Sequence, residues 1–111
     1  MSAHSQSTAP IDGRLDMLRH FPALLARWKG AHARMSELTV SHRTLRISLH
    51  INERPGYLVV ACVYPLFIHG AVEWDDAGIS VHLHGDEDFV VTDSAADFRV
   101  IAASVEVKEY A

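Results

Sequence analysis

The spacing of apolar residues divides the chain into a helical part followed by a part built from strands. Ile11, Leu15, Leu18, Leu25 and Trp28 follow one another in helical steps and would share one face of a helix. A residue of N-cap type, Asp12, lies at the start of this pattern. The first third of the chain is therefore predicted to be helical.

Pro22 interrupts this helical stripe, because it has no backbone N–H to donate to the carbonyl of Leu18. The segment is either one kinked helix or two helices. A second helix beginning at Pro22 would end near Gly30, since proline is common at the first helical position and glycine just past the last. Alternatively, the helix continues to about Met35.

From about residue 44 the apolar positions alternate, as they do in a half-buried strand. Leu45, Ile47, Leu49 and Ile51 alternate with polar residues and give the clearest strand. The stretch at 57–64 is apolar at nearly every position, which predicts a central strand covered on both faces. Further strands are predicted at "FIHGAVEW", "GISVHLH", "FVVT" and "FRVIAASVEVKEY".

These patterns predict an α+β fold with one or two N-terminal helices packed on a curled, mostly antiparallel sheet. The sheet would have five or six strands in meander order, because the predicted turns are short. A chain of 111 residues is long enough for one core. We expect residues 1–10 to be a disordered tail and residues 11–111 to form a single domain.

Composition limits the compartment and the chemistry. The only cysteine, Cys62, lies in the apolar run "LVVACVY" and is predicted to be a buried small hydrophobe. The first ten residues contain no apolar signal segment, and the longest apolar stretch is too short to cross a bilayer. We therefore expect a soluble, cytoplasmic protein.

The charges are divided unevenly between the two halves of the chain. Residues 1–50 contain seven Lys and Arg against three Asp and Glu, a formal charge of +4, whereas residues 51–111 contain three against eleven, a charge of -8. We expect the two halves to pack side by side and compensate each other. No basic run is dense enough to follow a phosphate backbone, so a nucleic-acid partner is not expected.

The stretch "GISVHLHGDED" carries the one candidate metal site. His82 and His84 would point to the same face of a strand, with Cα atoms roughly 6.6 Å apart. If "DDAG" is a hairpin turn that pairs the residue before it with Ile79, His69 joins the same cluster and Glu73 lies further along that face. Three imidazoles would suit zinc or nickel.

Three functions from different classes follow. The first is a small non-enzymatic interaction protein that recognises a protein partner through shape and charge, since no phosphate loop, nucleophile elbow or catalytic triad is evident. The second is a metal-binding β protein that uses His69, His82 and His84. The third binds a small apolar ligand between helix and sheet, in a pocket lined by the strand at 57–64. A homodimer is a further possibility, because a strand covered on both faces needs more cover than one helix gives.

Overall fold

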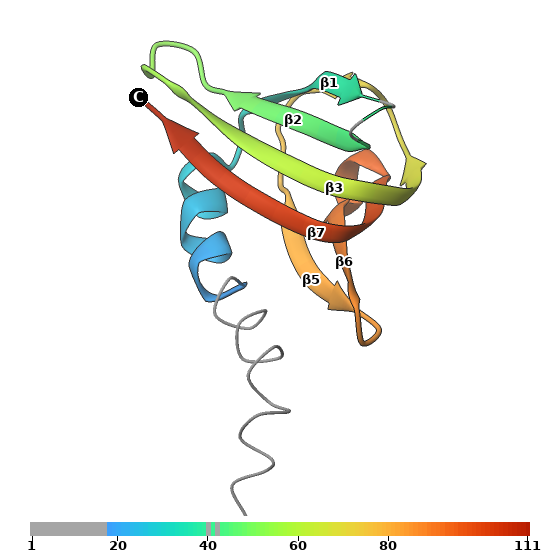
Figure 1. Cartoon of the computed structure of the whole chain (residues 1–111). Helices are drawn as coiled ribbons and strands as arrows, with labels where there is room; N and C mark the ends of the chain where they lie inside the picture. Colours follow the sequence, from blue (N-terminus) through green and yellow to red (C-terminus); the bar gives the residue numbers. More distant parts are fainter. Residues whose placement is uncertain (1–17, 40, 42) are drawn as a thin grey trace, which may run out of the picture.

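The computed structural model describes residues 18–39, 41 and 43–111, which form a curled sheet with a helix beside it (Figure 1). The predicted tail at 1–10 and the predicted start of the helix near Asp12 lie outside the described residues.

The helix runs continuously through residues 18–27 and turns its apolar side toward the sheet. Phe21, Leu25 and Trp28 are buried in the core. A second helix beginning at Pro22 is wrong, because the residues before it are already helical. The predicted end near Gly30 is confirmed, since that residue has a φ of 88° that favours glycine.

Seven strands form one antiparallel sheet with the order β4-β1-β2-β3-β7-β6-β5. The strands are β1 (His32–Thr39), β2 (Thr44–His50), β3 (Tyr57–His69), β4 (Glu73–Trp74), β5 (Ser80–His84), β6 (Asp88–Asp93) and β7 (Phe98–Tyr110), with a short 3-10 helix η1 (Ser94–Ala96) between the last two. A curled, antiparallel sheet is confirmed, whereas the predicted strand count and meander order are wrong.

The order differs from a meander because the two longest strands, β3 and β7, pair with each other. Strands β1 to β3 form one meander and β5 to β7 form another, and the β3–β7 pair joins them in the middle of the sheet. Both strands have thirteen residues, so this junction is the longest ladder in the molecule.

Strand β1 was not predicted, and the possible helical extension to Met35 is wrong. A bulge between Met35 and Glu37 shifts the pairing of β1 with β2 by one residue. The apolar residues Ala33, Met35 and Leu38 consequently pair with the inward positions Leu49, Ile47 and Leu45 of β2. The step of three residues across the bulge resembles helical spacing and hides the alternation.

The predicted hairpin at "DDAG" is also wrong. Trp74 pairs with Ala33 of β1, and β5 pairs with β6 rather than with β4. Residues 75–79 do not reverse the chain but carry it from one edge strand of the sheet to the other. Ala77 fastens this connection, because it exchanges backbone hydrogen bonds of 2.8 and 2.9 Å with Gly30 and Ala31.

Strand β3 lies in the middle of the sheet, as predicted, but only one of its faces is fully covered. Leu58, Val60 and Cys62 are completely buried on the concave face. Between them, Val59 and Val63 on the opposite face are half-buried, beside polar neighbours on β2 and β7. The strand continues past Pro65, with a bulge between Pro65 and Phe67.

The core lies inside the curl and includes the apolar helix residues. Cys62 is completely buried within it, as predicted, and burial raises the pKa of its thiol to about 12. The described helix is too short to cross a membrane.

Candidate binding surfaces

The three histidines of the predicted metal site lie on the convex face of the sheet but on strands far apart. Paired residues share a face, and the pairs run from His82 through Val90 and Ile101 to Phe67. His69 lies two residues beyond Phe67 on β3. Three strand spacings therefore separate His69 from His82, on the order of 14 Å.

Both imidazoles of a shared zinc site would place a nitrogen about 2.0–2.1 Å from the ion, and backbones this far apart do not favour such an arrangement. Nε2 of His69 instead lies 3.1 Å from Oδ2 of Asp97. His82 and His84 both lie on β5. Within residues 18–39, 41 and 43–111, no group of three His, Cys, Asp or Glu side chains is placed to hold a metal. Metal binding stays a prediction from sequence alone.

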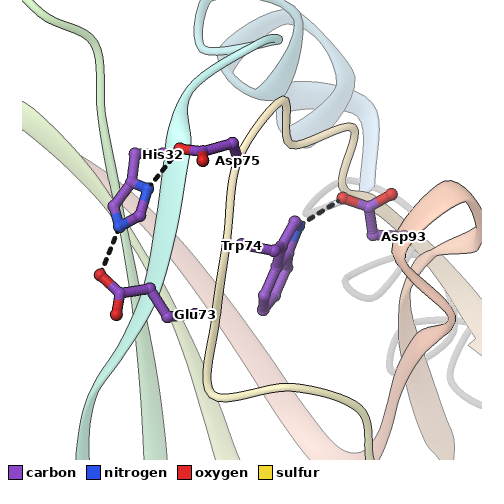
Figure 2. A network of polar contacts seen from close by, with 5 residues as sticks. All are labelled: His32, Glu73, Trp74, Asp75 and Asp93. Atoms are coloured by element: carbon purple, nitrogen blue, oxygen red, sulfur yellow. Dashed lines mark hydrogen bonds and ion pairs between the residues drawn. The ribbon is translucent and has the colours of Figure 1, made fainter.

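Glu73, the fourth predicted ligand, takes part in a different contact. Its Oε2 atom lies 2.5 Å from Nε2 of His32, and Oδ1 of Asp75 lies 2.7 Å from Nδ1 of the same ring (Figure 2). When protonated, the imidazolium donates from both nitrogens. The hydrogen bond to Asp75, followed by the one to Glu73, raises the pKa of His32 above 6.5.

The side chain of the next residue, Trp74, points away from His32, to the opposite side of this segment (Figure 2). Its Nε1–H donates to Oδ2 of Asp93 over 2.8 Å, and the backbone N–H of Gly78 donates to the same oxygen over 2.8 Å. Asp93 is only 2 % exposed. The segment that joins the two edges of the sheet is thus held by polar contacts on both sides.

Ion pairs connect side chains of the first half of the chain with carboxylates of the second half. Besides the contacts of His32, Nε of Arg27 lies 3.2 Å from Oε2 of Glu109 on β7. The same carboxylate accepts a hydrogen bond of 2.6 Å from Nε1 of Trp28. The guanidinium of Arg54 stacks over the Trp28 ring, and these contacts fasten the end of the helix to the sheet.

Large apolar side chains are exposed at the end of the sheet where β3 leads into β4. They form an apolar rim that consists of Leu38, Tyr64, Leu66, Phe67, Ile68 and Val72. Leu66 and Val72 are the most exposed, at 60 and 65 %. Val72 is tied to β1 by its carbonyl, which accepts a hydrogen bond of 2.8 Å from the N–H of Met35. Such a concentration of exposed apolar residues is typical of an interaction surface.

Two arginines adjoin the rim. The guanidinium of Arg43 lies 5.7 Å from the centre of the Tyr64 ring, and that of Arg99 lies 5.2 Å from the centre of the Phe67 ring. Neither arginine forms an ion pair with another residue in the described part of the chain. The rim therefore combines apolar area with positive charge, although the half of the chain that supplies most of it is acidic.

A groove of about 350 Å³ lies between the helix and β5. Its apolar lining consists of Phe21, Pro22, Leu25, Ala26, Ile79 and Val81. Lys29, Ser80 and His82 are exposed polar residues of the same lining. A pocket between helix and sheet was predicted, but its predicted wall is wrong, because the groove is lined by the segment around β5 and not by β3.

Sequence reasoning missed the rim and assigned the wrong wall to the groove, because each depends on strand order. The signal available for the rim was the apolar run "YPLFI", which lies across the end of one predicted strand and the start of the next. Comparison of the chain with protein-family models, with curated protein sequences and with solved structures finds no match in any of the three.

Proposed function

We propose that this chain is a small, non-enzymatic binding protein that recognises a protein partner through the apolar rim. The observation that carries the proposal is the exposure of six large apolar side chains at one end of the sheet. Burial of this area against a partner would remove it from water, which supplies about 25 cal/mol for each Å² of apolar surface.

Charge indicates the kind of partner. Arg43 and Arg99 each hold a guanidinium over an aromatic ring of the rim, which keeps the cation beside the apolar surface. Arginine and aromatic residues are enriched among the residues that dominate binding energy. We therefore infer a partner surface with an apolar centre and carboxylates around it, rather than a second copy of this chain.

Photo-crosslinking tests this proposal. A photoreactive amino acid replaces Leu66 in the rim and, as a matched control, Tyr57, which is an exposed residue at the opposite end of the same strand. The protein crosslinked from Leu66 but not from Tyr57 is then purified, and its Kd for the full chain is measured.

Substitutions within the purified complex distinguish a real interface from a chance crosslink. Leu66→Ser should raise the Kd by roughly 30-fold, the equivalent of about 2 kcal/mol for a central contact. Arg99→Glu should lower the association rate and its salt dependence, whereas Tyr57→Ser should leave the Kd within twofold. Equal Kd values for Leu66→Ser and the unsubstituted chain would overturn the proposal. A crosslink between two copies, with a dimer lost on Leu66→Ser, would also overturn it.

A further inference from the structure

We propose that the free edge of β5 binds an extended segment of another protein as an additional strand, with the groove beside the helix receiving its side chains. This proposal concerns a surface separate from the apolar rim and does not depend on the function proposed above.

Strand β5 is the last strand of the sheet and pairs only with β6. In an antiparallel pair, alternate residues direct their backbone N–H and C=O groups away from the partner strand. Along Ser80–His84 these groups form no hydrogen bond with any other segment that the structure describes. The edge therefore offers a row of donors and acceptors to an incoming strand.

This edge lacks three features that commonly prevent strand addition, namely lysine, proline and a bulge, and the helix beside it leaves a groove open between them. Edge strands are commonly protected by lysine, proline, a bulge or very short length. The five residues "SVHLH" contain no lysine or proline, and their pairing with β6 has no register shift. At the opposite edge, β4 has only two residues and is held by His32. Strand β5 is therefore an edge strand without these three features.

The groove runs along this open edge, because its lining includes successive residues of the strand. Val81 faces the core and His82 faces outward, yet both line the groove, together with the helix residues Phe21 and Leu25. On the far side of β5 from β6, the helix forms the opposite wall (Figure 1). A guest strand would fit between this wall and the β5 backbone.

The lining defines the chemistry of the guest. Five paired residues span about 17 Å, and alternate guest side chains would point to opposite faces. One set would enter the apolar groove against Leu25 and Ala26, and the other would lie beside Ser80 and His82. Lys29 forms no ion pair with another described residue, so an acidic side chain at one end of the guest is favoured. We infer an extended segment with alternating apolar residues and a terminal carboxylate.

Selection from a library of random twelve-residue peptides displayed on phage, with the full chain as bait, tests the proposal. Enriched peptides are synthesised with a fluorophore, and their Kd is measured by fluorescence anisotropy. The expected peptides alternate apolar and polar residues. On binding, they should slow hydrogen exchange of the β5 amides.

Two alanines of the helix provide a matched pair of variants. Ala26 lines the groove, whereas Ala23 is another exposed position of the same helix and lies outside it. Ala26→Trp should fill the groove and raise the Kd at least tenfold, while Ala23→Trp should change it less than twofold. N-methylation of a central peptide residue should also raise the Kd about tenfold, because it removes a backbone donor.

Several results would overturn this proposal. They are the absence of enriched peptides, equal binding to Ala26→Trp, equal binding of the N-methylated peptide, and unchanged exchange of the β5 amides. A dimer of this chain that Ala26→Trp dissociates would show that a second copy occupies the edge instead. Leu66→Ser should leave the peptide Kd unchanged, so failure at the rim and failure at the groove are distinguishable.

Discussion

The buried carboxylate of Asp93 is predicted to be a main polar support of the fold. Its Oδ2 atom accepts hydrogen bonds from the indole of Trp74 and the backbone of Gly78, both over 2.8 Å. Asp93→Ala would leave both part-buried donors without this acceptor. A hydrogen bond to a charged group contributes about 1.5–3 kcal/mol, so the free energy of unfolding should fall by roughly 3–5 kcal/mol.

Such a loss is a large part of the ~5–15 kcal/mol that stabilises a typical domain. It should lower the Tm by about 12–20 °C, taking about 4 °C per kcal/mol for a chain of this size. Asp93→Asn keeps one oxygen acceptor and loses only the charge, so the expected loss is smaller, about 1–2 kcal/mol. The assay is urea unfolding followed by tryptophan fluorescence, with thermal unfolding by circular dichroism.

The matched control is Glu106→Ala, which removes a carboxylate at an exposed position of β7. It should change the unfolding free energy by less than about 0.5 kcal/mol. Trp74→Phe keeps an aromatic ring against Phe98 while removing the indole donor, so its effect and that of Asp93→Ala should be strongly non-additive. Equal midpoints for Asp93→Ala and Glu106→Ala would refute the reasoning.

Three further predictions concern single residues. The pKa of His32 is raised in the folded state, so its stabilising contribution is complete below pH 6.5 and is lost as the pH rises through the folded-state pKa. The difference in urea midpoint between the unsubstituted chain and His32→Gln should therefore shrink from pH 5.5 to pH 8.5, and a constant difference would contradict this. Cys62 is fully buried, so its reaction with a thiol reagent should proceed only at the rate of unfolding, and immediate reaction in the native protein would contradict its placement. Gly70→Ala should cost about 2–4 kcal/mol, because the φ is 133° and the new Cβ would lie 2.7 Å from Cδ1 of Phe98. Gly85→Ala, with a φ of 66° but open space, should cost only about 1 kcal/mol by urea unfolding, and equal costs would contradict the steric argument.

The predicted strands follow from local pattern wherever one face is buried and the register is regular. In β2, Leu45, Ile47 and Leu49 alternate without interruption and are all buried, so its prediction was correct. In β1, the bulge after Met35 breaks that alternation, and the strand was missed. The local pattern of apolar residues thus predicts a strand only where no β-bulge interrupts the alternation.

Strand partners were harder to predict than the strands themselves. The chemistry of "DDAG" correctly indicates a bend, but a bend alone does not determine which strands lie on either side of it. Trp74 pairs with Ala33, which lies 41 residues earlier, and its ring packs beside that of Phe98 on β7. The predicted His69–His82 cluster was wrong for the same reason, because it assumed the wrong partner for β5. The wall of the groove was also mispredicted, because it depends on which strand is at the edge.

Residues 75–79 have a mechanical consequence for the molecule. They tether the two borders of the sheet by a link of five residues, which spans at most about 20 Å even when fully stretched. The curl consequently cannot flatten while β4 and β5 both keep their pairing at the two edges. Severing the chain within this tether, with the original ends joined, would release that restraint and let the borders spread.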